Sequence, residues 1–489
     1  MLLLRASRWA SHTLPRRPPR TVLSRLCSSH ASTPTTPTTP TLLSAKHQQL
    51  GVQQELFTTS IYSPGSPIFL PNGTRIFNRL VDFLRRQYVH YGFDEVITPT
   101  IYKKDLWAKS GHLDNYADDM FTVTSTSPSR TDDAQEEGEY GLKPMNCPGH
   151  CLIFASKVRS YRDLPIRYAD FSPLHRNEVS GALSGLTRVR RFHQDDGHIF
   201  CRPSQIEDEI AQTLAFVRET YRVLRMPSYR LALSTRPQDH YIGTLEDWAQ
   251  AESSLRRALD ASGEPWTLNE GDGAFYGPKI DVILTDRDGK EHQTATIQLD
   301  FQLPKRFELE YVAPAPEVEQ RGETTTDAEL LAVSGPVRPV MIHRAVLGSV
   351  ERLMALLIEH HQGKWPLWLN PRQAILLTLN DHEATVQWAE HARDVLRSVD
   401  GPGAPPVMAV DVDDSARPLS QKIRQAKNKG YSLVGVIGPG EVEGGTVMVD
   451  FGDLPLPEGA PSRGKGSAKK SMTPEGLRGY MHEMIRAHQ

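Results

Sequence analysis

Residues 174–201, LHRNEVSGALSGLTRVRRFHQDDGHIFC, bring together side chains that are able to do chemistry. The segment holds four arginines, two adjacent aspartates and three histidines. The planar guanidinium of arginine is suited to gripping phosphate through two parallel hydrogen bonds. We therefore ask which local structure would place these groups on one surface.

A strand over residues 187–200 would sort these side chains onto two faces, because successive residues of a strand point in opposite directions. One face would carry Arg188, Arg190, Phe192, Gln194, Asp196 and His198. The other would carry Val189, Arg191, His193, Asp195 and Ile199. An aromatic ring between arginines makes a platform for a flat anionic molecule with a polar molecule beside it. The alternative is an exposed strand whose charges form salt bridges.

The whole chain has an ordinary globular composition of 489 residues, with 38% hydrophobic and 24% charged residues. No apolar run approaches the 18 residues of a membrane-spanning helix. Four cysteines, Cys27, Cys147, Cys151 and Cys201, are too few for a secreted disulfide scaffold of this length. A reducing compartment is therefore expected, with any special thiol acting as a ligand or nucleophile.

Residues 1–54 differ from the rest, because they contain six arginines and one lysine but no acidic residue. This composition is typical of a mitochondrial transit peptide, followed by a disordered linker at STPTTPTTPT. A disordered basic tail of a cytosolic protein is the alternative. The remaining residues keep all 59 acidic but only 49 of the 56 basic side chains, a net charge of −10. Nucleic acid would therefore have to bind a local basic patch.

The remaining chain divides into two parts. Periodicity and stop signals predict helices at 74–92 and 203–226, a strand at 93–99, and polar surface loops at 122–139 and 313–328. Beyond WPLWLNPRQ, strands alternate with helices, which predicts a small α/β domain with a mostly parallel sheet. The expected organisation is 1–54 targeting segment and linker, 55–365 first domain and 366–489 second domain.

The stretch HRNEVSGALSGLTRVRRFHQDDGHIF resembles motif 2 of class II aminoacyl-tRNA synthetases, in the form found in threonyl-tRNA synthetases. The resemblance extends over residues 60–450 through five further segments: YGFDEVITP (motif 1), MNCPGHC, GDGAFYGPKID, TIQLDFQLP and PVMIHRAVLGSVERL, which contains motif 3. It implies an α/β fold class, with an α+β catalytic domain on a mostly antiparallel sheet and an anticodon-binding domain after it. The implied activity is ATP-dependent ligation of threonine to tRNA(Thr).

The resemblance also assigns the ATP half of the site. Arg176 and Arg352 would be catalytic, clamping the phosphates as pyrophosphate leaves. Glu178 would orient the adenine, Phe192 would stack on it and Arg188 would meet the γ-phosphate. Lys279 and Gln293 complete the ATP-binding set, and Mg²⁺ accompanies the nucleotide.

The amino-acid half would hold one zinc ion per subunit on Cys147, His198 and His343. Zinc that takes the amino and hydroxyl groups of threonine would reject valine and only weakly reject serine. The residues expected around the substrate are Gln194, Asp196, Tyr276, Thr294 and Gln298. Thr294 stands where many family members carry cysteine, and Ala295 where they carry glycine, so the pocket floor is expected to differ slightly.

The resemblance is to the short mitochondrial form, without an N-terminal editing domain, because no HxxxH pattern occurs. It implies a homodimer formed through motif 1, working in the mitochondrial matrix without membrane association. QKIRQAKNKG resembles a tRNA-contacting helix, which makes Lys422, Arg424 and Glu441 candidates for anticodon contact. The alternative is a solvated charged helix face. Asp450 replaces an arginine that is usual in the family.

Two competing interpretations of the whole chain stay open at this point. Another class IIa synthetase, such as the prolyl or seryl enzyme, is disfavoured by the Cys/His/His set together with Gln194 and Asp196. A synthetase-like protein that binds RNA without catalysis would be expected to have lost the motif arginines. Arg176, Arg188 and Arg352 are all present.

Overall fold

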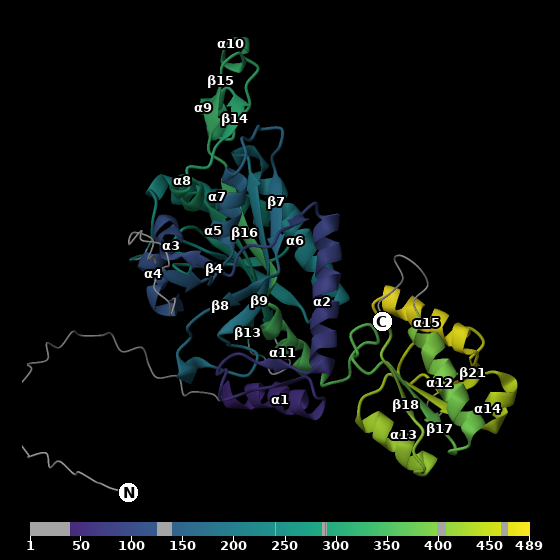
Figure 1. The fold of residues 1–489 in the computed structure, drawn as a ribbon. Coiled ribbons are helices and arrows are strands. Elements are labelled where there is room, and N and C mark those ends of the chain that lie inside the picture. Colours follow the sequence, from purple (N-terminus) through teal and green to yellow (C-terminus); the bar gives the residue numbers. More distant parts are fainter. Residues whose placement is uncertain are drawn as a thin grey trace, which may run out of the picture. The chain divides into compact units, whose positions relative to one another are not determined.

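The computed structural model describes residues 40–124, 139–239, 241–285, 289, 291–398, 407–460 and 468–489. The expected transit peptide lies outside these ranges, as does most of the predicted loop 122–139. Figure 1 shows the course of the chain.

A nine-stranded sheet carries the first part of the chain, in the order β11-β10-β12-β13-β16-β9-β7-β3, with β8 paired to β9. Its pairings are antiparallel except β10 with β11 and β3 with β7. In chain order the strands are β3 (Asp94–Glu95), β7 (Ile166–Asp170), β8 (Pro173–His175), β9 (Arg191–Cys201), β10 (Tyr229–Ser234), β11 (Trp266–Asn269), β12 (Lys279–Thr285), β13 (Glu291–Asp300) and β16 (Val340–Ser349).

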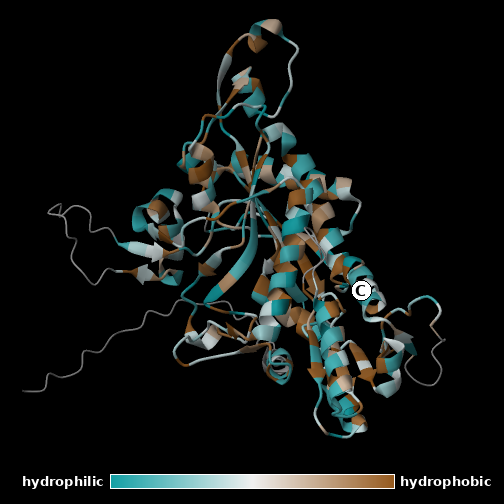
Figure 2. Cartoon of the chain, turned by 45° about the vertical axis from the view of Figure 1, so that its right-hand side comes forward, coloured by the Kyte–Doolittle hydropathy of each residue, from teal (hydrophilic) through white to brown (hydrophobic). Residues whose placement is uncertain are grey.

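One face of this sheet packs against amphipathic helices. They are α2 (Pro71–His90), α6 (Ile206–Val223), α7 (Leu245–Ser262) and α11 (Val350–His361). In α2, apolar residues recur every three or four positions, and Ile76, Leu80 and Leu84 are fully buried. Figure 2 shows hydrophobic and hydrophilic residues mixed along the helices of the chain. Strand residues that face them, such as Ile199, Ile297 and Ile342, complete the core.

The opposite face of the sheet carries the polar partners of those core residues, because side chains alternate along each strand. Three of these polar residues are next to a buried isoleucine or leucine in the sequence: His198, Gln298 and His343. The strand register places His343 opposite His198 on one side and opposite Gln298 on the other. This face is partly covered by α5 (Cys147–Ala155) and α8 (Gln302–Arg306), through a second cluster that includes Phe154, Phe200 and Phe307.

Smaller elements surround this sheet. They are α1 (Pro40–Gln53), β1 (Phe57–Thr58), β2 (Ile68–Phe69), β4 (Ile101–Lys103), α3 (Lys104–Ser110), α4 (His112–Tyr116), η1 (Ala117–Asp119), β5 (Thr122–Val123), β6 (Tyr140–Leu142), η2 (Ser180–Ala182) and η3 (Pro203–Gln205). Helix α1 falls inside the range that we expected to be linker, and His47 on it is fully buried. The domain boundaries themselves stay predictions.

The predicted loop 313–328 is structured, which corrects that expectation. Strands β14 (Tyr311–Pro314) and β15 (Ser334–Val337) pair antiparallel, with α9 (Pro316–Gln320) and α10 (Ala328–Leu331) between them. Glu319 is buried and accepts hydrogen bonds of 2.6 Å from Arg202 and 2.7 Å from the Tyr311 hydroxyl. A small apolar cluster of Tyr311, Ala313, Val337 and Leu164 packs beside this ion pair, so both kinds of contact hold the polar segment.

The last part of the chain forms a five-stranded sheet in the order β18-β17-β19-β20-β21. β17, β18 and β19 are parallel, and β20 and β21 are antiparallel additions. The bounds are β17 (Ala374–Thr378), α12 (Glu383–Arg397), β18 (Val410–Asp413), α13 (Leu419–Asn428), β19 (Leu433–Ile437), α14 (Pro439–Gly444), β20 (Val447–Asp450), β21 (Lys469–Met472) and α15 (Pro474–Arg486). Thr473 caps the start of α15, because its hydroxyl accepts a hydrogen bond from the Gly476 amide.

Candidate active site

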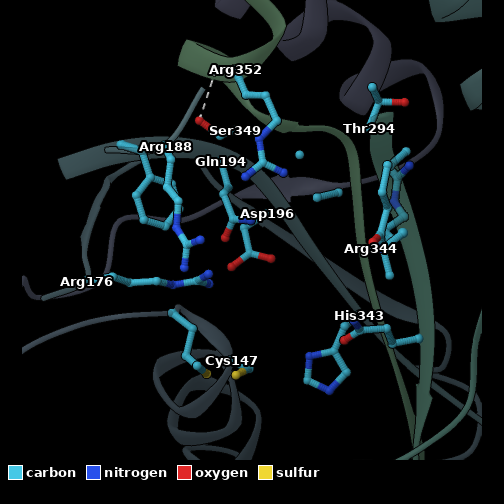
Figure 3. A pocket seen from close by; sticks show the side chains of 18 of the residues that line it. Cys147, Arg176, Arg188, Gln194, Asp196, Thr294, His343, Arg344, Ser349 and Arg352 are labelled. Carbon is cyan, nitrogen blue, oxygen red and sulfur yellow. Dashed lines mark hydrogen bonds between the residues drawn. The ribbon is translucent and has the colours of Figure 1, made fainter. Parts of the chain in front are cut away.

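A cavity of about 340 Å³ opens on the polar face of the large sheet. Strands β9, β13 and β16, the start of α11 and the loop of residues 180–188 surround it (Figure 3). It brings together most of the residues that the resemblance assigned: Cys147, Arg176, Glu178, Arg188, Phe192, Gln194, Asp196, His198, Tyr276, Gln293, Thr294, Gln298, His343 and Arg352. Lys279 does not line it. Residues separated by up to 205 positions therefore converge on one volume.

Three guanidinium groups, which we call the Arg cluster (Arg176, Arg188 and Arg352), occupy one end of the cavity (Figure 3). Arg188 donates to Glu178 at 2.8 Å, and Arg352 donates from Nε to the Thr187 carbonyl at 3.1 Å. Burial lowers the pKa of Arg352, and the charges of Arg176 and Arg188 lower it further. This end of the cavity thus has a positive potential that an anion would relieve.

An aromatic surface accompanies the Arg cluster. The Arg176 guanidinium carbon lies 5.0 Å from the centre of the Phe192 ring. Phe192 is nearly buried between Leu174 and Val189, which fixes its plane. The strand pattern predicted Phe192 on the cavity side together with Gln194 and Asp196, and this is confirmed. Arg190 differs, because its Nε donates to the Glu178 carbonyl and it does not line the cavity.

The other end of the cavity holds a buried Cys–His cluster, Cys147, His198 and His343. Their ligand atoms lie within 4.8 Å of one another. One thiol and two imidazoles are donors that Zn²⁺ prefers, and three protein ligands leave a position open for substrate. The residues present therefore fit a zinc ion.

The outer partners of both histidines support this fit. His343 donates from Nε2 to Asp300 at 2.8 Å, which leaves Nδ1 for a metal. His198 Nδ1 contacts His150 Nδ1 at 2.8 Å, which leaves Nε2. Ligand histidines commonly hold their second nitrogen in this way, and the hydrogen bond fixes the ring orientation.

Burial controls the protonation of the Cys–His cluster. It raises the pKa of the Cys147 thiol well above its ordinary value and lowers that of His198 well below it. Neutral imidazole is the form that binds a metal. A thiolate at Cys147 requires a cation nearby, and metal binding would release the thiol proton.

Between the two ends lie polar groups that can orient a small zwitterion. Asp196 accepts a hydrogen bond of 3.1 Å from Asn146, and burial raises its pKa. The Tyr276 hydroxyl donates to Gln298, and Gln194 lies on the same strand face as Asp196. This arrangement offers a carboxylate for an ammonium group and amides for a carboxylate or hydroxyl.

Two assigned residues are placed differently from the expectation. Thr294 stands at a β-bulge, because the register passes from Val282–Ala295 to Ile283–Gln293 and leaves it out. Its hydroxyl is hydrogen-bonded to Tyr221 at 2.6 Å, on the helix side of the sheet. Thr294 still lines the cavity, so its contact with the amino acid stays a prediction, with the hydroxyl turned towards Tyr221.

Lys279 is held away from the cavity. Its Nζ pairs with Asp281 at 2.7 Å and with Asp272 at 3.0 Å. Asp281 also accepts from Gln293 Nε2 at 2.5 Å, and Gln293 does line the cavity. Lys279 thus pairs with the carboxylate that contacts Gln293, and its role in ATP binding stays a prediction.

The three candidates for anticodon contact differ in how far their side chains are exposed. Arg424 is exposed on α13, and Glu441 is half-buried and caps the Gly438 amide. Lys422, in contrast, is 1% exposed, and its Nζ donates to the carbonyls of Thr378 and Asp413 at 2.8 and 3.1 Å. The expectation of a direct RNA contact by Lys422 is therefore corrected, since the side chain anchors α13 to the sheet.

Sequence reasoning missed three buried residues beside the Cys–His cluster. His112 Nε2 lies 4.0 Å from Cys147 Sγ, and His150 and Asp300 contact the two histidines. His150 follows Cys147 by three residues on α5, a spacing that brings both onto one helix face. Asp300 ends the TIQLD segment. No spacing signal points to His112.

Comparison with known proteins decides the family. Residues 129–361 match the family described as tRNA synthetase class II core domain (G, H, P, S and T), and residues 373–453 match the anticodon binding domain. The chain is 51% identical over 403 residues to a probable mitochondrial threonine–tRNA ligase of Schizosaccharomyces pombe, covering 81% of this chain and 82% of that protein. It belongs to the threonine–tRNA ligase family.

Two further threonine–tRNA ligases are also similar to this chain. The mitochondrial protein of Saccharomyces cerevisiae is 46% identical over 438 residues, covering 86% of this chain and 88% of that one. A solved structure titled the RNA binding domain of threonyl-tRNA synthetase from Cryptosporidium parvum Iowa II matches with a TM-score of 0.76 at 44% identity, over 90% of this chain and 98% of that chain. Within the described residues, no helix of this ligase has the length and apolar character needed to cross a membrane.

Proposed function

We propose that the chain activates threonine with ATP to threonyl-adenylate and pyrophosphate, and then transfers threonine to the 3′ end of tRNA(Thr). The observation that carries this proposal is the single cavity that joins the Arg cluster to the Cys–His cluster. A polyphosphate fits the first end and an amino acid with a metal-binding side chain fits the second. The α-phosphate would lie between them, where the two substrates must meet.

The Arg cluster would stabilise charge during activation. Arg176 and Arg352 would hold the α-phosphate and the leaving pyrophosphate, while Arg188 would meet the γ-phosphate. Phe192 and Glu178 would hold the adenine, and Mg²⁺ would accompany the phosphates. Because fixed cations need not reorganise as charge develops, positioning and charge neutralisation supply most of the rate enhancement.

Cys147, His198 and His343 would hold one Zn²⁺ per subunit. A zinc ion bound there would accept the amino and hydroxyl groups of threonine as ligands, which valine is unable to supply in full. Gln194, Asp196, Tyr276 and Gln298 would orient the same substrate. Asp300 and His150 would keep the two histidine rings in the orientation that coordination needs.

We propose a mitochondrial matrix location, because residues 1–54 are arginine-rich and acid-free and the Schizosaccharomyces pombe and Saccharomyces cerevisiae relatives are named as mitochondrial. We also propose the domain limits 1–54, 55–365 and 366–489, with Arg424 and Glu441 facing the anticodon. A homodimer through motif 1 is supported by its position, since β3 is an edge strand and the nearby Ile97 is 86% exposed.

An amino-acid-dependent ATP–pyrophosphate exchange panel tests the proposal. Threonine should support exchange and proline should not, and the purified chain should charge tRNA(Thr). Exchange with proline in place of threonine would overturn the substrate assignment. Loss of exchange with every amino acid, in a folded protein that still binds tRNA(Thr), would favour an RNA-binding protein without catalysis.

A further inference from the structure

We infer that His47, on α1, is a positioning residue for the ATP end of the cavity. It holds the loop of residues 180–188 and helix α11, which carry Arg188 and Arg352. The inference rests on the ATP-binding roles proposed above. It concerns a residue in the segment whose composition indicated only a linker.

Both nitrogens of the fully buried His47 ring are engaged. Nε2 accepts a hydrogen bond of 3.1 Å from the Leu186 amide, and Nδ1 donates to Glu359 at 3.0 Å. An amide N–H only donates and a carboxylate only accepts, so the partners require one tautomer, with the proton on Nδ1. His47 therefore joins the loop to α11 by two directional bonds.

Both partners of His47 lie close to the Arg cluster. Leu186 precedes Thr187, whose carbonyl accepts the 3.1 Å hydrogen bond from Arg352 Nε, and Thr187 precedes Arg188. Glu359 follows Arg352 by seven residues on α11, which is two helical turns on the same face. The loop and α11 thus meet at Arg352 on one side and at His47 on the other.

The contact between His47 and the loop is closely packed. Gly185 has a positive φ of 48°, and a Cβ there would lie 2.2 Å from His47 Nε2. A side chain at this position would collide with the ring, and the backbone conformation also favours glycine. Leu186 beside it is fully buried. The loop is therefore fitted around His47 rather than merely lying near it.

Kinetic comparison of His47→Ala with Gln49→Ala tests the inference. Gln49 is an exposed residue of the same helix and serves as the matched control. Losing the loop contact should raise the KM for ATP in pyrophosphate exchange about 5- to 20-fold, the range for one buried hydrogen bond, and leave the KM for threonine unchanged. Gln49→Ala should match the parent.

A second pair keeps the test decisive if His47→Ala does not fold. Glu359→Gln still accepts from His47 Nδ1 and should keep a normal KM for ATP, whereas Glu359→Ala should raise it. Equal increases in both KM values, or none, in folded variants would overturn the inference. If Arg352→Ala loses exchange while His47→Ala keeps a normal KM for ATP, only this inference fails. If Arg352→Ala keeps exchange, the proposed ATP site itself fails.

Discussion

Single residues divide the cavity into two ends with opposite chemistry. Among the described residues, Glu178 is the carboxylate that pairs with the Arg cluster, so the positive charge of the three arginines is only partly compensated. In the Cys–His cluster, burial raises the pKa of the Cys147 thiol and lowers that of His198, which disfavours the charged form of each. An anion suits the first end and a cation the second.

Replacing Arg176 or Arg352 with alanine should abolish most adenylate formation without unfolding the protein. Each change removes a fixed cation from charge that grows in the transition state, a loss of about 3 kcal/mol or a factor of 10²–10³ in rate. Pyrophosphate exchange measures this directly, and circular dichroism checks the fold. Near-normal exchange in either variant would contradict the role.

At the scale of elements, helix α13 carries one basic side chain that is buried and another that is exposed. Lys422 faces the sheet and Arg424 faces solvent, although both belong to the same KIR sequence. Charge type alone gives no indication of this difference. The position of each residue around the helix does indicate which side chain is buried, once it is known which side of α13 packs against the sheet.

Lys422→Ala should lower the free energy of unfolding by about 1–3 kcal/mol, because it leaves buried carbonyl groups without their donor. Arg424→Ala should leave stability within about 0.5 kcal/mol and weaken tRNA binding instead. Denaturant unfolding and a tRNA-binding titration separate the two. Unchanged stability in Lys422→Ala would show that its hydrogen bonds contribute little.

The segment from β14 to β15, residues 311–337, should lose stability in acid. Burial alone would raise the Glu319 pKa, but hydrogen bonds from Arg202 and Tyr311 lower it below its ordinary value. A lowered folded-state pKa gives stability that is present above the unfolded value, near 4.5, and is lost as pH falls through the folded value. Limited proteolysis near residue 320, measured across this pH window, should show acid-enhanced cleavage in the parent. Glu319→Gln should be cleaved readily at every pH.

Period-two alternation was enough to predict which side chains of β9 face the cavity. Phe192, Gln194 and Asp196 are every second residue of one regular strand, and all three line the cavity. The assignment of Thr294 came from the family resemblance, and the bulge there places its hydroxyl on the helix side of the sheet. A bulge depends on pairing with β12, which no local pattern contains. The Cys–His cluster also required the family resemblance, because its members lie on three distant elements.

At the scale of the whole molecule, the part of the chain after the arginine-rich start does more than connect. Helix α1 delivers His47 to the loop and α11, and Gln54 accepts a hydrogen bond from Trp365 at 2.8 Å. Composition suggested a linker here because the range up to residue 54 contains the STPTTPTTPT stretch and no acidic residue. The hydrogen bonds of His47 and Gln54 depend on residues far along the chain, so they became visible only in the assembled structure.

A chain that begins at residue 40 should be fully active in vitro, whereas a chain that begins at residue 55 should not. The longer form keeps His47 and Gln54, and the shorter form loses both. We expect the shorter form to have a KM for ATP at least about 5-fold higher, in line with the loss of a buried hydrogen bond. Equal steady-state kinetics of the two forms would show that α1 is dispensable.

The most direct test of the two-ended cavity is pyrophosphate exchange with threonine, serine and valine, alongside zinc analysis of the same preparation. We predict one zinc per chain, exchange with threonine, serine exchange about 10- to 200-fold weaker because one methyl group is missing, and none with valine. Cys147→Ser should lose zinc and threonine exchange together. Valine exchange in the zinc-loaded protein, or threonine selectivity that survives without zinc, would contradict the account.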